Sequence, residues 1–291
     1  MGLLYAAGTS LVLFSCTKQK EITLASDTNT NETAKKIPSE QHPANALLLS
    51  EEEYNKLPKV NFAQLALTSK NPITAAEKSR GQRFLSAPPV GDQGTEGSCV
   101  GWGVGYAATS IIRYPDFNNW NTARRSPSYV YNQIKVGSCA SGSYVSDALN
   151  LCKNQGVCSI VSMPYLDGQC YINPTNSQRN EASQNKVTGW SSLNRKDIKG
   201  IKQALDLGYP VPIAFDVTKA FDDMGNRDGI WDNNYGTVRG GHCTCIVGYD
   251  NKKKMFKVEN SWGSNWGDNG YFWVTYDLVA GGCLSEIYTI N

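Results

Sequence analysis

The chain of 291 residues is long enough for one or two domains with a substantial buried core. Hydrophobic residues make up 40% and charged residues 19%, which is typical of a globular protein and excludes a disordered one. The formal net charge is only +2, and the densest basic cluster is Lys252, Lys253 and Lys254. We expect these lysines in a solvated turn between strands, and nothing indicates a nucleic-acid partner.

The first residues predict export. Residues 3–14 are apolar or small, and the chain turns polar after residues 13–16, which read Leu-Phe-Ser-Cys. The apolar run is shorter than the roughly 20 residues that a membrane helix needs, and it is typical of a secretory signal. Leu, a variable residue, a small residue and Cys resemble the bacterial lipobox, although no Lys or Arg precedes the run. Residues 1–16 are therefore expected to be a lipoprotein-type signal peptide, the alternative being a buried N-terminal helix.

This signal predicts where the protein resides. Lipidation of Cys16 after cleavage would attach the protein to a bacterial envelope membrane, on the periplasmic face or at the cell surface. Without that anchor we expect the protein to be secreted.

A polar region separates the signal from the main domain. Residues 17–43 are rich in Thr, Asn, Glu, Lys and Ser and are expected to form a flexible tether. Residues 44–83 carry scattered apolar positions, which fit either a short pro-segment or a strand that wraps the main domain. We therefore treat residues 17–80 as a tether and possible pro-segment, and residues 81–291 as the globular domain.

The globular domain begins with helical patterns and ends with strand patterns. Helical spacing occurs at residues 100–112, 128–135 and 145–154. Short β-branched or aromatic runs bounded by Gly, Asn and Asp occur at residues 211–217, 244–249, 255–259, 271–275 and 286–290. Helices followed by strands predict an α+β domain of two lobes.

One segment carries a candidate nucleophile. Residues 92–102 read Asp-Gln-Gly-Thr-Glu-Gly-Ser-Cys-Val-Gly-Trp, which places Cys99 at the first turn of the expected helix. There the helix dipole and the free backbone N–H groups favour the thiolate, although the alternative of a buried structural cysteine remains. Gln93 lies across a Gly-rich turn, where its amide can point to the same space as the Cys99 N–H. Two converging donors would stabilise a tetrahedral oxyanion.

The histidine count limits the possible partners of this cysteine. The chain contains His42 and His242, and His42 falls in the expected tether. If Cys99 has an imidazole partner, it is therefore His242. Without other context, a histidine entering an apolar strand after two glycines is usually structural.

The next strand supplies that context. Residues 258–267 read Val-Glu-Asn-Ser-Trp-Gly-Ser-Asn-Trp-Gly. Two adjacent antiparallel strands would bring Asn260 beside His242, so that the amide oxygen accepts a ring N–H and fixes the tautomer. Trp262 could shield this bond from water. A nucleophile, a base and a residue that orients the base form the arrangement used by cysteine proteases.

Three blocks in this order resemble the papain family of cysteine peptidases. They are Gln-Gly-x-x-Gly-Ser-Cys at residues 93–99, Gly-His at 241–242 and Asn-Ser-Trp-Gly-x-x-Trp-Gly at 260–267. Softer similarities lie at residues 126–129, 139–144 and 229–231. The resemblance covers roughly the last two-thirds of the chain, and three blocks at workable spacing are jointly specific.

The resemblance implies a papain-like two-lobe fold. A helical lobe would carry Cys99, an antiparallel β-rich lobe would carry His242 and Asn260, and the peptide would lie in the cleft between them. It also implies a cysteine-type endopeptidase, in which a thiolate–imidazolium pair cleaves peptide bonds through an acyl-enzyme. The implied partner is a peptide or protein substrate bound by a monomer, with no metal or cofactor.

The resemblance also indicates substrate-binding residues. Gly142 and Ser143 match the Gly-rich segment whose backbone pairs with bound peptide, and Gly241 and Trp262 flank the base. Gly241 offers no charge beside His242. We therefore expect the pocket before the scissile bond to accept apolar rather than basic side chains.

The cysteines depart from the family pattern. Glu96 stands where the family usually has another cysteine, so Cys139 lacks its usual partner. We expect a bridge between Cys158 and Cys170, which flank a short turn. No Cys-x-x-Cys pair is present to indicate zinc.

Two other functions fit the same residues. The triad suits any acyl transfer, so a peptide ligase or deamidase is one alternative. The other is an inactive homologue that binds peptides without cutting them. The presence of Gln93, Cys99, His242 and Asn260 together argues against the inactive homologue.

Overall fold

The computed structural model describes residue 38 and residues 41–291. The expected signal peptide, residues 1–16, and the expected lipidation site Cys16 therefore lie outside the described residues. So does most of the expected tether.

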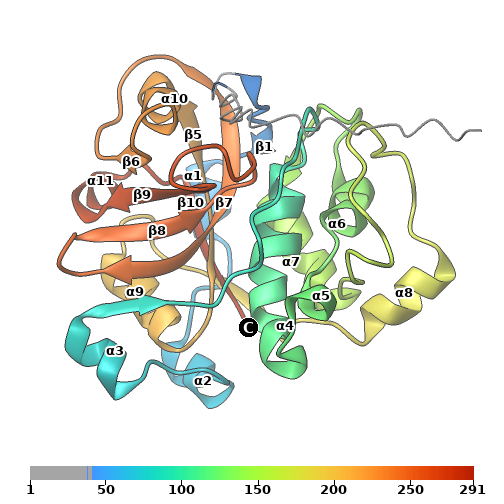
Figure 1. Cartoon of the computed structure of the whole chain (residues 1–291), viewed down its shortest axis with the longest axis horizontal. Coiled ribbons are helices and arrows are strands. Elements are labelled where there is room, and N and C mark those ends of the chain that lie inside the picture. Colours follow the sequence, from blue (N-terminus) through green and yellow to red (C-terminus); the bar gives the residue numbers. More distant parts are fainter. Residues whose placement is uncertain (1–37, 39–40) are drawn as a thin grey trace, which may run out of the picture. The chain divides into compact units, whose positions relative to one another are not determined.

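One lobe of the described chain is helical (Figure 1). Its elements are the π-helical segment η2 (Gly101–Ala108), α4 (Thr109–Phe117), α5 (Trp120–Ala123), α6 (Pro127–Ile134), α7 (Val145–Asn154) and α8 (Asn176–Ser183). The three predicted helices are all present. The first is longer than predicted, because a helix that begins at Cys99 continues through η2 and α4 and ends where Asn118 adopts a left-handed conformation, φ 51°.

The other lobe is built around a mostly antiparallel sheet (Figure 1). Its strands follow the order β4-β10-β5-β7-β8-β9-β6, in which β6 pairs with β9 in parallel. They are β4 (Trp190–Ser192), β5 (Val211–Thr218), β6 (Ile230–Trp231), β7 (Val238–Asp250), β8 (Met255–Glu259), β9 (Tyr271–Thr275) and β10 (Glu286–Ile290). Three helices accompany them, α9 (Ile198–Asp206), α10 (Lys219–Gly225) and α11 (Tyr276–Gly281). The α+β prediction is confirmed, and the three lysines at 252–254 are exposed in a turn between β7 and β8.

One predicted strand boundary is wrong. Strand β7 was expected to begin at Thr244, but it begins at Val238, so His242 lies inside the strand. The two preceding glycines belong to the strand because they pair with Val217 and Asp216 of β5, and backbone carbonyls of the N-terminal region leave no room there for a side chain. A Cβ atom on Gly240 would lie 2.0 Å from the Ala44 oxygen, and one on Gly241 would lie 2.3 Å from the Ala46 oxygen.

The region before the predicted domain is also folded. It contains β1 (Ala46–Leu47), α1 (Glu51–Asn55), α2 (Phe62–Leu67) and α3 (Ala75–Arg80), and β2 (Gln82–Phe84) follows at the start of the predicted domain and pairs with β7. Capping boxes begin α1 and α3, with Ser50 and Thr74 as caps and Glu53 and Glu77 as their partners. The alternatives for this region were a short pro-segment and a strand that wraps the main domain. The described part contains a strand that contacts both lobes, because β1 pairs with β7 and with β3 (Ser143–Tyr144).

Small residues allow the helix that begins at Cys99 to pack closely on both lobes. A Cβ atom on Gly101 would lie 2.8 Å from the Pro127 oxygen in α6, and one on Gly103 would lie 3.0 Å from the Cys243 sulfur in β7. Larger side chains would push the helix away from one lobe or the other. The lobes therefore meet along this helix.

Gly101→Ala tests this packing. Because the Pro127 carbonyl belongs to the backbone, the added methyl group should lower the free energy of unfolding by about 1–3 kcal/mol. The matched control is Gly281→Ala in α11, where nothing lies within 4 Å of the added atom. Chemical denaturation should show a loss only for Gly101→Ala, and equal stabilities of the two variants would contradict the packing argument.

Candidate active site

Cys99 is the first residue of the helix that continues through η2 and α4, and it faces β7. Its side chain is completely buried. Burial raises the pKa of the Cys99 thiol, while backbone hydrogen bonds, including those of Cys243, Asn45 and Ala46, act in the opposite direction. Two of these residues, Asn45 and Ala46, come from the N-terminal region rather than from either lobe.

His242 and Asn260 form a hydrogen-bonded pair, as the antiparallel strands predicted. The His242 Nε2 and Asn260 Oδ1 atoms are 2.7 Å apart, and both residues are buried. Because an amide oxygen only accepts, Nε2 carries the proton and Nδ1 offers its lone pair. Burial lowers the pKa of His242 to about 3, although the hydrogen bond to Asn260 acts in the opposite direction.

Aromatic rings surround the imidazole. The ring centroid of Trp262 lies 4.6 Å from that of His242, and Phe215 and Phe221 lie at 5.8 Å and 6.3 Å. Trp262 therefore lies where the sequence placed it, beside the pair of His242 and Asn260. These rings exclude water from the hydrogen bond between the two residues.

The thiol and the imidazole are both buried, and no hydrogen bond joins them. Nδ1 of His242 has no hydrogen-bond partner among the described residues, so it is not bonded to Cys99. Burial favours the neutral form of both groups, because it raises the thiol pKa and lowers the imidazole pKa. Burial therefore opposes formation of a thiolate–imidazolium pair in this arrangement.

Gln93 is buried beside the same cleft. Its Oε1 accepts hydrogen bonds from Ser261 Oγ at 2.7 Å and Trp262 Nε1 at 3.2 Å, and its Nε2 donates to the Glu96 carbonyl at 2.9 Å. Three bonds fix the orientation of this amide. They use one of its two amide hydrogens, which leaves one hydrogen for another acceptor.

Residues 42–49, which we call the cleft segment, run between the two lobes. Ala46 pairs in parallel with Ser143 and in antiparallel fashion with Gly241. A Cβ atom on Gly142 would lie 1.5 Å from the Asn45 oxygen. His42 stacks on Trp262, with ring centroids 5.0 Å apart and planes at 7°. All four predicted substrate-binding residues, Gly142, Ser143, Gly241 and Trp262, therefore contact the cleft segment.

Polar bonds anchor both ends of the cleft segment. At one end, Arg239 Nη1 donates to the His42 carbonyl at 2.7 Å while its guanidinium group pairs with Asp222 at 2.8 Å. At the other end, the Leu49 N–H donates to Glu286 Oε1 at 2.6 Å. The expectation that His42 lies in a flexible tether is wrong, because His42 is 4% exposed against Trp262.

Tyr54 holds the chain that follows the cleft segment. Its hydroxyl donates to the carbonyls of Leu193 and Ile287, at 2.8 Å and 2.7 Å, and accepts from the Ile287 N–H at 2.8 Å. Only one of the two carbonyls can receive its single proton at a time. The Tyr54 ring meets the edge of Tyr288, which is fully buried. The N-terminal region thus covers Tyr288 as well as the cleft.

The predicted bridge between Cys158 and Cys170 is wrong. Cys170 is bonded to Cys139, with Cα atoms 5.4 Å apart. Cys158 is buried elsewhere, on the segment whose carbonyl accepts from the Ser126 N–H before α6. The loops that carry Cys139 and Cys170 meet beside Glu96, at the place of the missing family cysteine.

This place also contains the one group of potential metal ligands among the described residues. Glu96, Cys139 and Cys170 have ligand atoms within 4.8 Å of one another. The two cysteines are joined in the disulfide, so they carry no thiolate for a metal.

Sequence reasoning missed the position of the cleft segment. The capping box at Ser50 and Glu53, together with the apolar residues 47–49, was a local signal for a folded element there. Nothing local signalled that Glu286, distant in sequence, would accept the Leu49 N–H. In the part of the chain that the structure describes, no helix is long and apolar enough to cross a membrane.

Comparisons with known proteins agree with the geometry. Residues 79–288 match the family described as papain family cysteine protease. The chain is 31% identical over 214 residues to an uncharacterized peptidase C1-like protein of Acanthamoeba polyphaga mimivirus, an alignment that covers 68% of each. It is 27% identical over 197 residues to cathepsin B-like CP2 of Giardia intestinalis, covering 64% of this chain and 63% of that protein.

Solved structures show the same fold. Xylellain, a cysteine protease from Xylella fastidiosa, superposes with a TM-score of 0.67 at 22% identity, covering 89% of this chain and 99% of that one. ProCathepsin B S9 from Trypanosoma congolense gives a TM-score of 0.61 at 19% identity, covering 86% and 87%. The predicted two-lobe fold is confirmed.

Docking of the cleft segment should depend on pH through His42. The pKa of His42 is lowered from 6.5, mainly by burial. Arg239 acts in the same direction, whereas Asp92 and Asp222 act in the opposite direction. Because the docked imidazole resists protonation, docking should be strongest above pH 6.5 and weaken as the pH falls below it. The lowered pKa of His242 acts in the same direction.

Hydrogen exchange of residues 42–49 measures this dependence, after correction for the intrinsic effect of pH on exchange. His42→Gln keeps a polar group and cannot be protonated, so it should flatten the loss of protection below pH 6.5. An unchanged pH profile in His42→Gln would exclude His42 as the responsible group.

Proposed function

The chain belongs to the papain family of cysteine proteases, and we propose that it is an endopeptidase whose nucleophile is Cys99. In this proposal His242 is the general base and acid, Asn260 orients it and Gln93 helps to bind the oxyanion. The observation that carries the proposal is the hydrogen bond of 2.7 Å from His242 Nε2 to Asn260 Oδ1, which leaves Nδ1 as the proton acceptor on the ring.

The proposed reaction follows from these groups. The proton of the Cys99 thiol passes to His242 Nδ1, and the thiolate attacks the scissile carbonyl carbon. The free amide hydrogen of Gln93 and the Cys99 N–H stabilise the oxyanion. His242 then protonates the leaving amine as the C–N bond breaks. Water, activated by His242, hydrolyses the thioester and restores the thiol.

We also propose that the chain with its cleft segment docked is latent. The segment contacts the predicted substrate-binding residues Gly142, Ser143, Gly241 and Trp262, so a substrate could not pair there at the same time. Cys99 and His242 are also fully buried while the segment is docked, which opposes the charged pair that the reaction needs. Activation therefore requires the segment to leave the cleft.

The contacts of the segment support a preference for apolar substrates. The Leu48 side chain lies where a Cβ atom on Gly241 would meet its Cγ at 3.1 Å, and Leu48 packs against the hydrophobic core. A substrate side chain that replaced Leu48 would meet the same apolar surroundings. Peptide or protein substrates with an apolar residue near the scissile bond are therefore the proposed class.

Two alternatives use the same residues. An acyl transferase of the ligase or deamidase type would pass the acyl group to an amine or release ammonia. An inactive homologue would bind peptides without forming the acyl-enzyme. The lone pair at His242 Nδ1 favours a reactive site over the inactive homologue, because a proton acceptor is present on the buried ring.

Turnover of a diverse peptide library tests the mechanism. We compare the full chain, a chain that begins at residue 50, and variants of the shorter chain. Cys99→Ala should abolish cleavage, and His242→Ala should lower kcat by about 10²–10⁴-fold. Asn260→Ala should be milder because Asn260 orients the base. The full chain should cleave more slowly than the shorter one.

The outcomes separate the alternatives. Cleavage by Cys99→Ala would exclude the mechanism, and equal rates for the full and shorter chains would exclude latency. Product ligated to added amines in place of hydrolysis would favour the acyl transferase. Labelling of Cys99 by a peptide epoxide without turnover would favour the inactive homologue.

We propose that Cys16 attaches the protein to a bacterial envelope membrane, from the lipobox-like residues 13–16. The protein produced in a bacterial host should carry a lipid on Cys16 and sediment with membranes. Mass spectrometry of the N-terminal fragment measures the lipid, with Cys16→Ala as the control. An unlipidated, soluble wild-type protein would exclude this attachment.

A further inference from the structure

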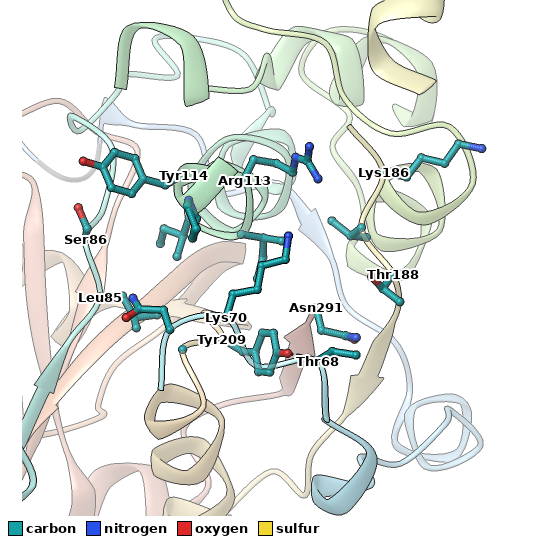
Figure 2. Close-up of a pocket in the computed structure, with 16 residues that line it drawn as sticks. Thr68, Lys70, Leu85, Ser86, Arg113, Tyr114, Lys186, Thr188, Tyr209 and Asn291 are labelled. Carbon is teal, nitrogen blue, oxygen red and sulfur yellow. Dashed lines mark hydrogen bonds between the residues drawn. The ribbon is translucent and has the colours of Figure 1, made fainter. Parts of the chain in front are cut away.

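A cavity of about 280 Å³ lies between the lobes, apart from the active site (Figure 2). Ile111 and Ile112 of α4 form one wall, and Leu85 and Tyr209 of the β lobe form another. Lys70, from the N-terminal region between α2 and α3, completes it. Neither the residues of the proposed triad nor those of the cleft segment line this cavity.

The lining combines apolar walls with positive charge. Three of the lining side chains are basic, Lys70, Arg113 and Lys186, and none is acidic. Figure 2 shows the Lys70 side chain extending toward the middle of the cavity, whereas Lys186 points away from it. The charge that a ligand would meet therefore comes mainly from Lys70, with Arg113 on the adjoining helix.

Asp116 shows that Lys70 and Arg113 together can bind a carboxylate. It pairs with Lys70 at 3.0 Å and with Arg113 at 3.1 Å, so a single carboxylate faces two cations. The Nε atom of Arg113 is buried and has no hydrogen-bond partner among the described residues. A second anionic group could be accommodated by the remaining charge and by this N–H donor.

We propose that the cavity binds a small organic anion with an apolar or aromatic body. Its charged group would lie at Lys70 and Arg113, and its body would contact Leu85, Ile111 and Ile112. The cavity volume of about 280 Å³ lies just below the lower end of the range for small-molecule sites, about 300 Å³, so the ligand would be small.

The position of Lys70 links this ligand to the N-terminal region. Thr68 and Tyr209 are hydrogen-bonded through their hydroxyls at 2.7 Å, and Ser69 Oγ donates to the Leu207 carbonyl at 2.7 Å. Lys70 therefore lines the cavity only while these hydrogen bonds hold Thr68 and Ser69 in place. A ligand that contacts Lys70 binds the docked form more tightly and stabilises it by the same factor.

This consequence rests on the proposed latency of the docked form. In the full chain the anion would oppose release of the cleft segment by retaining residues 62–71, and it would not inhibit a chain that begins at residue 50. Binding of the anion does not depend on any catalytic activity, so the anion site and the proposed latency can be tested separately.

The binding test uses the full chain carrying Cys99→Ala and the fluorescent anion 8-anilinonaphthalene-1-sulfonate. N-phenyl-1-naphthylamine, which has the same rings without the sulfonate, is the neutral comparison. The anion should bind at one site and more tightly than the neutral compound. Lys70→Gln and Arg113→Gln should each weaken the anion about tenfold, as expected for a lost charge-assisted hydrogen bond. Lys252→Gln, in the exposed turn, should leave it unchanged.

Hydrogen exchange of residues 62–71 then tests the link. Saturation with the anion should slow exchange there in the Cys99→Ala chain, and Lys70→Gln should remove the effect. Equal binding of the neutral compound, or binding unaffected by Lys70→Gln, would overturn the anion site. Binding without slower exchange would overturn the link to the N-terminal region. Because Lys70 is largely exposed, its variant decides the question if Arg113→Gln does not fold.

Discussion

The close packing of the helix that begins at Cys99 against strand β7 is the contact on which the rest of the site depends. At Gly103 the helix lies so close to the Cys243 sulfur and the Thr244 backbone that a larger side chain would contact them. This approach fixes the thiol beside the strand that carries His242. The antiparallel register of β7 and β8 then brings Asn260 next to the imidazole. A small residue in one helix thus determines the geometry of groups on two lobes.

Desolvation governs the state of this site. A thiolate and an imidazolium stabilise each other, but both are unfavourable in a buried cleft without water. Cys99 and His242 are fully buried while the cleft segment is docked, and the shifted pKa values of both residues favour the neutral forms. In the proposed latent form, the docked segment would therefore both block the cleft and oppose charge on the two groups.

The residues of the proposed triad could be singled out from sequence because their signals are local. Cys99 at a helix start, His242 in an apolar strand and Asn260 before Trp262 each stand in a distinctive block. Helical spacing likewise predicted the helices η2–α4, α6 and α7, and β-branched runs predicted the strands β5, β7, β8, β9 and β10, whereas the remaining helices and the short strands β1, β2, β3, β4 and β6 were not predicted. These patterns reflect interactions within one element or between neighbouring strands, which short stretches of sequence encode.

The features that could not be predicted depend on distant contacts. His42 reads as part of a polar tether, and its burial depends on Trp262 and Arg239, which lie about 200 residues away in the chain. The early start of β7 depends on its pairing with β5, in which Gly240 lies opposite Val217 and Gly241 opposite Asp216. The partner of Cys170 depends on how two loops meet, which the spacing of cysteines does not determine.

In the proposed latent form, the docked cleft segment keeps Cys99 and His242 uncharged. The most direct test is the ultraviolet absorbance of the thiolate at neutral pH, taken as the difference between each protein and its Cys99→Ala variant. The account predicts no thiolate signal in the full chain and a clear signal in a chain that begins at residue 50. A thiolate signal of the same size in the full chain would contradict it.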